Sequence, residues 1–208
     1  CIFFGLYHPF DYLRFILHRG PKLVIWCGSD IFQMGWLSRI IKKIKAQHIC
    51  ENELEASVLT MLLGGQIPFV KPLFFGDVEK YDVSFKPSKR PHVYLFSHSG
   101  GGAEWQSGIH TVRYIAGELP EFTFHVYGTN AKYQSNNIIF HGKVPEEQLD
   151  EEIKNYHCGL RLHYFDGFSE VTAKSILMGQ YPITRIAFPF IDSFRADEEL
   201  VELLKKLK

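Results

Sequence analysis

The sequence contains few cysteines and none at the spacing of a metal site. Its four cysteines, Cys1, Cys27, Cys50 and Cys158, lie far apart, without a C-x-x-C pair. This distribution argues against a disulfide scaffold and against a zinc site, so we expect reduced, mostly buried thiols. The ten histidines include no H-E-x-x-H motif, and no metal is therefore expected.

The sequence also lacks any excess of one charge and any long apolar run. Lys plus Arg and Asp plus Glu both number 23, and no basic stripe alternates with aromatics, which excludes nucleic acid as an expected partner. No run approaches the ~20 apolar residues that span a bilayer. We therefore expect a cytoplasmic protein. Because the chain opens on Cys1 without an initiator Met, we also expect it to be the trailing part of a longer protein.

Two common enzyme motifs are missing. The segment SHSGGG, residues 97–102, is not a dinucleotide fingerprint, because Trp105 stands where G-x-G-x-x-G needs its last glycine, and a nicotinamide cofactor is disfavoured. No G-x-S-x-G is present, so nothing supplies the nucleophile of an esterase. No cofactor is predicted.

The sequence does contain regular alternation of short β-rich runs with amphipathic helical windows. In 208 residues that are 46% apolar and 22% charged, this pattern predicts an α/β fold with parallel sheets. Strands are predicted at residues 23–26, 48–50, near 69, and at 92–96, 122–127, 138–140, 159–162 and 182–184. Helices are predicted at residues 35–45, 51–63, 104–119, 146–156, 169–178 and 196–207.

The pattern breaks over residues 75–91, where the chain is polar and contains two prolines. Such a stretch is typical of an interdomain linker. The predicted organisation is an N-terminal α/β domain at 1–76, a linker at 77–91 and a C-terminal domain at 92–208.

Three loops of the C-terminal domain, at residues 97–102, 142–145 and 163–169, follow predicted strands and should meet at one sheet edge, where open α/β sheets bind ligands. In the first loop, consecutive glycines allow backbone amides to approach a phosphate. The candidate donor residues there are Gly100, Gly101 and Gly102. A turn that needs glycine only for its conformation is the alternative, and both interpretations stay open.

The third loop carries a resemblance to a known family. The segment DGFSEVTAKSILMGQYPI, from Asp166 to Ile183, resembles the E-G-F and E-x7-E region of retaining glycosyltransferases of family 4. FHGKVPEEQLDEEIKNYHCGLRL and IWCGSD resemble other parts of that family, so that about two thirds of the chain is covered. The resemblance implies a GT-B-like architecture: a Rossmann-like C-terminal domain that binds a nucleotide sugar and, here, a partial N-terminal domain.

The resemblance assigns roles to residues of the third loop. Asp166 takes the place of the catalytic carboxylate beside the donor sugar, and Gly167, Phe168 and Ser169 take the place of amides that face the donor phosphates. A helix N-terminus carries roughly half a positive charge, which suits a diphosphate. Lys174 stands where the family has a ribose-binding glutamate, although a lysine can only donate. It is either a donor contact or the partner of Glu170 in an i,i+4 ion pair.

Further candidates lie in neighbouring loops. Gly142, Lys143 and Val144 are predicted to form the base pocket. Arg161 or Lys143 would be needed to neutralise the diphosphate, but Arg161 lies inside a predicted strand and Lys143 is better suited to the base pocket, so Lys143 alone is a weak candidate. Asp30, in the G-S-D turn, is a candidate for the acceptor side or, alternatively, a turn-capping residue. The helix Gly35 to Lys45 is basic and amphipathic, so it either makes peripheral membrane contact or packs on the sheet.

The implied function is transfer of a sugar from a nucleoside diphosphate sugar to a sugar, lipid or protein acceptor, with retention and without metal. Electrostatic stabilisation of the leaving diphosphate by the helix terminus would supply most of the catalysis. The alternatives are a non-catalytic GT-B-like module that binds nucleotides or acts as a scaffold, and a sensor that binds without turnover.

Overall fold

The computed structural model describes residues 1–70, 74, 76–83, 86, 88–97, 106–130 and 135–207. Its contacts divide the chain into two compact units. Unit 1 comprises Cys1–Phe75 together with Phe165–Phe168, and unit 2 comprises Gly76–Tyr164 and Ser169–Lys208. The short segment Phe165–Phe168, which carries Asp166, thus packs with unit 1 although the chain on both sides of it belongs to unit 2.

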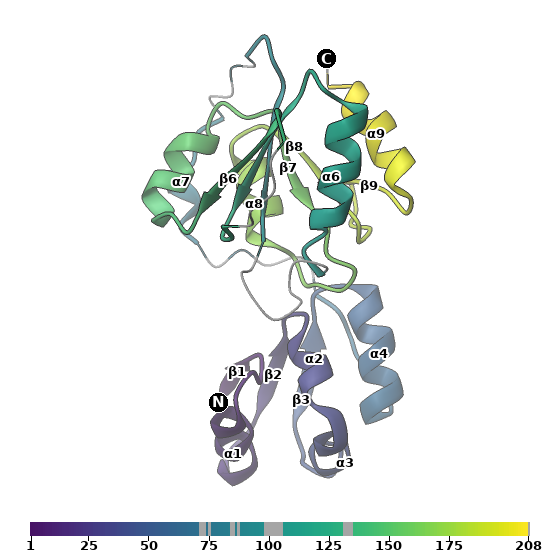
Figure 1. The fold of residues 1–208 in the computed structure, drawn as a ribbon. Helices are drawn as coiled ribbons and strands as arrows, with labels where there is room; N and C mark the ends of the chain where they lie inside the picture. The colour runs from purple at the N-terminus through teal and green to yellow at the C-terminus, as the bar shows by residue number, and fades with distance from the viewer. Residues whose placement is uncertain are drawn as a thin grey trace. The chain divides into compact units, whose positions relative to one another are not determined.

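Unit 1 is built on a parallel three-stranded sheet in the order β1-β2-β3 (Figure 1). The strands are β1 Ile2–Phe4, β2 Leu23–Trp26 and β3 Gln47–Cys50. The bounds predicted for β2 are confirmed, and β3 begins one residue before its predicted start. Beyond β3, Phe69 forms an isolated parallel bridge with Cys50, where the short strand was predicted.

The helices of unit 1 are α1 Pro9–Leu17, α2 Asp30–Gln33, α3 Ser38–Ile41 and α4 Glu53–Leu63, with a 3-10 turn at Gly35–Leu37. Their apolar faces meet β2 in a core that includes Phe15, Trp26, Ile31 and Leu59, each fully buried. The short α1 is not predicted from the sequence pattern. It begins at a proline, and Asp11 in its first turn accepts a hydrogen bond from the His8 N–H at 2.9 Å, which caps the helix.

The prediction of one continuous helix over residues 35–45 is wrong. Gly35 takes a φ of 43° and is followed by the 3-10 turn and by the single α-turn of α3. After α3, the N–H groups of Lys43 and Ile44 bond to carbonyls three residues earlier, the pattern of a 3-10 helix. The segment therefore has no long basic amphipathic face. No described helix is long and apolar enough to cross a bilayer.

Unit 2 is built on a six-stranded parallel sheet in the order β6-β5-β4-β7-β8-β9. The strands are β4 His92–Phe96, β5 Thr123–Tyr127, β6 Ile138–Gly142, β7 Cys158–Arg161, β8 Tyr181–Thr184 and β9 Asp192–Ser193. The bounds of β4 match the prediction, and β9 is not predicted because it has only two residues. With the strands numbered along this unit, the order is that of a doubly wound Rossmann sheet.

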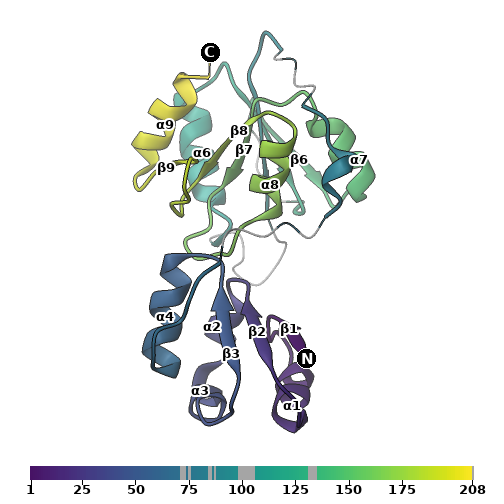
Figure 2. The same ribbon diagram turned by 180° about the vertical axis from the view of Figure 1, so that it is seen from behind.

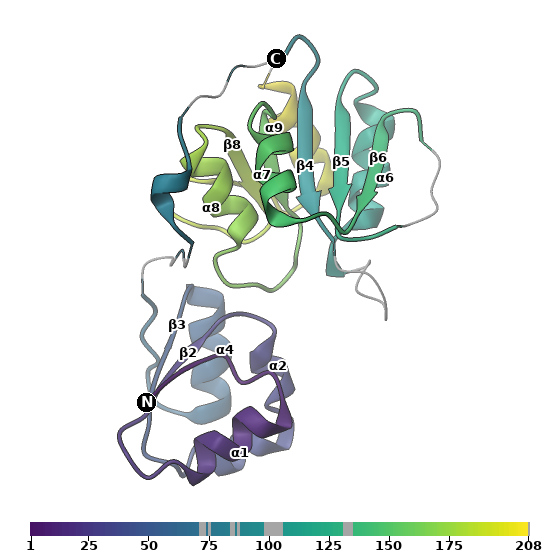
Figure 3. The ribbon, with the colours of Figure 1, turned by 90° about the vertical axis from the view of Figure 1, so that its left-hand side faces the viewer.

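Helices cover both faces of this sheet (Figures 1 and 2). α6 Ile109–Glu118 and α9 Asp197–Lys205 bury Val112, Ile115 and Leu200 on one face. α7 Glu146–Ile153 and α8 Glu170–Leu177 lie on the other, which Figure 3 shows from the front. A 3-10 turn, Val78–Lys80, lies within the stretch predicted as a linker. The parallel α/β fold class predicted from the sequence is confirmed.

Candidate functional site

The strand order of unit 2 defines where a ligand is expected. β4 and β7 are neighbours, and the chain winds away from them in opposite directions, first through β5 and β6 and then through β8 and β9. In sheets of this order, the carboxyl ends of the two strands at which the winding reverses are where a ligand-binding crevice forms. This is the topological switch point at which open α/β sheets bind nucleotides.

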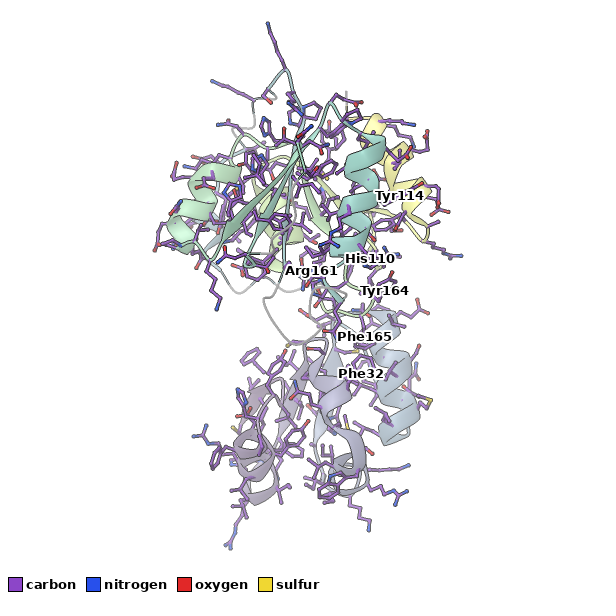
Figure 4. The ribbon with its side chains drawn as sticks, viewed as in Figure 1. Phe32, His110, Tyr114, Arg161, Tyr164 and Phe165 are labelled. Atoms are coloured by element: carbon purple, nitrogen blue, oxygen red, sulfur yellow. The ribbon has the colours of Figure 1, made fainter. Side chains whose placement is uncertain are left out.

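A cavity of about 350 Å³ lies at this place, within the size range of small-molecule sites. Its lining includes the last residues of three strands, Phe96 of β4, Tyr127 of β5 and Arg161 of β7. Arg161 is labelled in Figure 4. Val144, just before α7, and Ser169, just before α8, line it from the helix side together with residues of both helices. The residues that line the cavity thus come from strand ends of the sheet and from α7 and α8, all within unit 2.

Ser169 starts α8 as a helix cap. Its Oγ accepts a hydrogen bond from the Thr172 N–H at 3.3 Å, and the residue is buried. Capping fixes the direction of the first turn, whose remaining amides and partial positive charge point toward the cavity end of the helix. The sequence-predicted helix start at Ser169 is therefore a lining element of the cavity.

Lys174 is the most buried charge at the cavity, with a side chain only 4% exposed. Its Nζ lies 2.8 Å from Asp150 Oδ1, 3.1 Å from Glu146 Oε1 and 3.3 Å from Glu170 Oε1. Burial lowers the pKa of Lys174, but the hydrogen bonds to Asp150 and Glu146 outweigh burial and raise the pKa above its usual value. The predicted ion pair with Glu170 is present as one of three, and the ammonium group also lines the cavity.

Arg161 lines the cavity, which its predicted position inside a strand did not indicate. The predicted strand 159–162 placed it inside the strand, whereas β7 ends at Arg161 and its side chain lines the cavity. Strand ends predicted from sequence are uncertain by a few residues. Here a shift of one residue moves Arg161 from the strand interior to the ligand-binding edge.

The predicted base-pocket residues fall in different places. Val144 lines the cavity, whereas Lys143 is exposed and, like Gly142, is outside the lining. Gly142 has a φ of 68°, and a Cβ there would overlap Asn130 Oδ1, so a glycine suits this position. Gly100, Gly101 and Gly102 of the predicted anion loop lie outside the described residues.

The segment Phe165–Phe168 is held by side chains of unit 1. The Phe168 N–H donates to Glu51 Oε2 at 3.0 Å, and Asn52 Nδ2 donates to the Asp166 carbonyl at 2.8 Å. The rings of Phe32 and Phe165 lie side by side with centroids 4.3 Å apart (Figure 4). The Phe168 amide predicted to face a phosphate is thus engaged by a carboxylate.

Gly167 is buried, and a Cβ at this position would overlap Glu51 Oε2. The amide of Gly167 also lies close to Gly28, where a Cβ would come within 3.0 Å of the Gly167 nitrogen. The glycine at 167 therefore fits the loop closely against unit 1. Neither Gly167 nor Phe168 is among the residues that line the cavity of unit 2.

The carboxyl edge of the unit 1 sheet gathers buried acids near this segment. Asp30 is fully buried, and its two carboxylate oxygens accept from the Cys27 N–H at 3.2 Å and the Leu6 N–H at 3.3 Å. Burial raises the pKa of Asp30 to about 7. Asp30 thus ties the chain after β1 to the turn after β2, which is the turn-stabilising interpretation of the sequence.

Glu55 of α4 is the second buried acid. It is fully buried, and its Oε2 accepts from the Glu51 N–H at 2.8 Å. Among the described residues, its Oε1 has no hydrogen-bond partner. Burial, followed by the nearby Glu51 charge, raises the pKa of Glu55 to about 8. At neutral pH this side chain is therefore held mainly as the neutral acid.

These raised pKa values predict that unit 1 loses stability as the pH rises. A carboxyl group protonated more readily in the folded state stabilises that state fully below its unfolded pKa, and this contribution disappears as the pH passes the folded pKa. Between about pH 4.5 and 8, ionisation of Glu55 should lower the stability of unit 1 by on the order of 4 kcal/mol. Glu55→Gln keeps the acceptor for the Glu51 N–H and should make the amide exchange of β3 and α4 less dependent on pH, after correction for intrinsic rates. An unchanged dependence in this variant would show that Glu55 is already ionised.

The arrangement of strands and helices defines the class of fold, that of the GT-B glycosyltransferases. The solved structure of TarM superimposes with a TM-score of 0.69 at 10% identity, covering 99% of this chain and 47% of that chain. WaaG, a glycosyltransferase involved in lipopolysaccharide biosynthesis, gives a TM-score of 0.58 at 11% identity, covering 95% of this chain and 70% of that chain. The pneumococcal O-GlcNAc transferase GtfA, solved with UDP and GlcNAc, gives 0.55 at 13% identity, covering 88% and 44%.

The chain spans about half the length of TarM and of GtfA. No protein-family model and no curated protein sequence matches it. At such low identities the likeness shows the fold and does not identify functional residues of this chain.

Proposed function

We propose that the chain is part of a glycosyltransferase whose unit 2 binds a nucleoside diphosphate sugar in the cavity at the end of β4 and β7. The observation that carries this proposal is the coincidence of the cavity with the switch point of the Rossmann-ordered sheet. Strand ends and two helix beginnings meet there, which is the arrangement that binds nucleotides in sheets of this order.

The charges around the cavity suggest which part of the ligand goes where. Lys174 and Arg161 are the cations of the described lining. Lys174 is held by three carboxylates. The planar guanidinium of Arg161 lies at the end of β7, and its shape suits a phosphate. The proposed place of the diphosphate is therefore near Arg161 and the start of α8, whose helix terminus also favours an anion.

Glu146 and Glu170 supply the opposite chemistry. Both line the cavity, and their side chains are 64% and 62% exposed while Lys174 holds one oxygen of each. Their remaining lone pairs can accept hydrogen bonds from hydroxyl groups. The carboxylates around Lys174 would then replace the glutamate that the resembled family has at position 174, with Lys174 acting as the group that orients them.

The proposed reaction is transfer of the sugar to an acceptor with retention. Asp166 is proposed as the carboxylate beside the donor sugar, and Asp30 as a residue of the acceptor side. The α8 terminus would stabilise the leaving diphosphate, so the chemistry would need no protein nucleophile. A cytoplasmic location and an acceptor among sugars, lipids or proteins are further parts of this proposal. Peripheral membrane contact is not proposed, because the continuous Gly35 to Lys45 helix on which it rested is absent.

The proposal is tested by calorimetric titration with UDP, GDP, ADP, CDP and TDP, followed by transfer assays with the sugar form of whichever binds. UDP comes first because the GtfA structure contains it. Saturable binding of one nucleotide and release of that nucleotide from its sugar form are expected. If none of them produces heat, the donor site assigned to unit 2 does not exist.

The second candidate function is a GT-B-like binding module without turnover. Two observations favour it. Lys174 stands where the resembled family has a glutamate that accepts hydrogen bonds, and the chain covers only 47% of the length of TarM. The same experiments separate the two, because a module binds the nucleotide with full heat but neither hydrolyses nor transfers the sugar.

A further inference from the structure

Three histidines form a continuous hydrogen-bonded chain across three neighbouring strands of unit 2. His92 Nδ1 of β4 lies 2.8 Å from His125 Nε2 of β5, and His125 Nδ1 lies 2.9 Å from His141 Nε2 of β6. The central residue, His125, is only 6% exposed. These three residues are called the histidine chain below.

The histidine chain is connected to the end of α7. The Tyr156 hydroxyl, three residues beyond this helix, lies 3.1 Å from His125 Nδ1, and the two rings stack with centroids 4.4 Å apart. Within α7, Glu152 Oε2 accepts from the Tyr127 hydroxyl at 2.7 Å and lies 3.6 Å from His141 Nδ1. The hydroxyls of Tyr127 and Tyr156 are 3.3 Å apart.

The same contacts reach the cavity described above. Tyr127 lines it at the end of β5, and Glu146, Leu149 and Ile153 of α7 line it from the helix side. The packing of α7 therefore fixes one wall of the cavity, and the histidine chain with its tyrosine partners helps to fix α7.

The geometry of the chain limits how many protons it can hold. Each gap between two ring nitrogens accommodates one hydrogen, because a hydrogen bond needs a donor on one side and an acceptor on the other. With both gaps filled, only the outer nitrogens of His92 and His141 remain for protons. The intact chain therefore carries at most one positive charge, whereas three separate imidazoles in water would carry three at acidic pH.

The charged groups around the histidine chain do not supply enough negative charge to stabilise more than one positive charge on it. Glu152 is the carboxylate next to His141, whereas Arg90 adds a positive charge near His92, and His157 Nδ1 accepts the His92 N–H at 3.2 Å. Burial, followed by the neighbouring His92 and His141, lowers the pKa of His125 to about 3. Burial also lowers the pKa values of His92 and His141.

We propose that the histidine chain makes the packing of α7 against the sheet, and with it the wall of the cavity, sensitive to mildly acidic pH. Protonation beyond the single charge that the chain holds separates the rings and releases the contacts of Tyr156 and Glu152. The ring nitrogens bond to one another instead of converging on a centre, and no group of three or more His, Cys, Asp or Glu in the described chain is arranged to hold a metal ion.

The sign of the effect follows from proton linkage. A neutral histidine with a lowered folded pKa stabilises the closed state above its exposed pKa of about 6.5, and this contribution is lost as the pH falls toward the folded value. Opening that exposes His125 alone should become about tenfold more favourable between about pH 7.5 and about pH 5.5. Participation of His92 or His141 would increase this factor.

Amide hydrogen exchange of the whole chain at these two pH values, corrected for intrinsic rates, tests the proposal. In the wild type, α7 should lose at least about tenfold in protection at the lower pH, whereas α9 of the same unit should not change. In His125→Phe, which keeps an aromatic ring, the pH dependence of α7 should be smaller than in the wild type. His110→Asn is the matched control, because His110 lies on α6 and is not a member of the histidine chain. This variant should respond to pH like the wild type.

Equal loss of protection in α7 and α9, or an unchanged pH response in His125→Phe, would overturn the proposal. If His125→Phe does not fold, NMR titration of the wild-type imidazoles decides in its place. The His125 ring signals should then stay in the neutral form below about pH 5, while those of an exposed histidine titrate near about pH 6.5. Titration of His125 near the exposed value would contradict the proposal equally.

Discussion

Replacing Lys174 with methionine is expected to destabilise unit 2 by about 2 kcal/mol. Methionine fills a similar volume but leaves Asp150, which is 19% exposed, without its 2.8 Å ammonium partner, and brings Asp150, Glu146 and Glu170 together uncompensated. A fully buried pair would lose more, but the exposure of Glu146 and Glu170 lets water screen part of their charge. Amide exchange in α8 and β7 should become about 30-fold faster, the equivalent of this free energy.

Lys205→Met is the matched control for this prediction. Lys205 forms a 2.8 Å ion pair with Glu202, but both side chains are largely exposed, at 48% and 68%. Such an exposed pair contributes little to stability. If the two substitutions cost the same, the carboxylates around Lys174 do not depend on it, and its role as their orienting group is wrong.

Val144→Trp is expected to weaken nucleotide binding at least about tenfold, or about 1.4 kcal/mol. Val144 is half-buried and lines the cavity just before α7. An indole at this position would occupy space that the ligand needs, and it would do so without removing a charge or a hydrogen bond of the site. Calorimetric titration of the variant with the nucleotide that binds the wild type measures the loss.

Lys143→Trp places the same side chain one residue away. Lys143 is exposed and lies outside the cavity lining, so this variant should bind the nucleotide as the wild type does. The comparison also tests the sequence-based prediction that Lys143 belongs to the base pocket. Loss of binding in Lys143→Trp with full binding in Val144→Trp would show that the nucleotide binds beside Lys143 and not in the cavity lined by Val144.

Elements with a strong local pattern could be predicted from the sequence, and others could not. β2 and β4 are short, mainly apolar runs rich in β-forming residues, and their predicted bounds agree with the structure. The helix predicted over 35–45 has an equally regular apolar pattern. Its failure lies in the backbone, because the positive φ of Gly35 and the 3-10 turn after it are not encoded in hydrophobic periodicity.

The site was predictable as a location more than as a set of contacts. Parallel strands bring their carboxyl ends together, so Val144 and Ser169 were expected at the ligand edge and do line the cavity. Lys174 could be paired from sequence only with Glu170, because i,i+4 spacing is local. Its closer partners, Glu146 and Asp150, come from another helix and depend on tertiary packing.

The position of Asp166 shows the same limit. The chain before Phe165 and after Phe168 belongs to unit 2, but Phe165–Phe168 bonds to Glu51 and Asn52 of unit 1, more than a hundred residues earlier in the chain. The histidine chain likewise could not be predicted from the sequence, since its members are far apart in sequence and follow no metal motif. Contacts of this kind require strand order and register, which a single sequence does not specify.

The most direct measurement of the central claim is hydrogen exchange of the wild-type chain with and without the nucleoside diphosphate at saturating concentration. A ligand in the cavity of unit 2 should protect amides around Val144 to Leu149 and around Ser169 to Val171, which line it, and should leave those of α9 unchanged. Protection confined to other segments of the chain, or no protection at all, would contradict the assignment of this cavity as the nucleotide site.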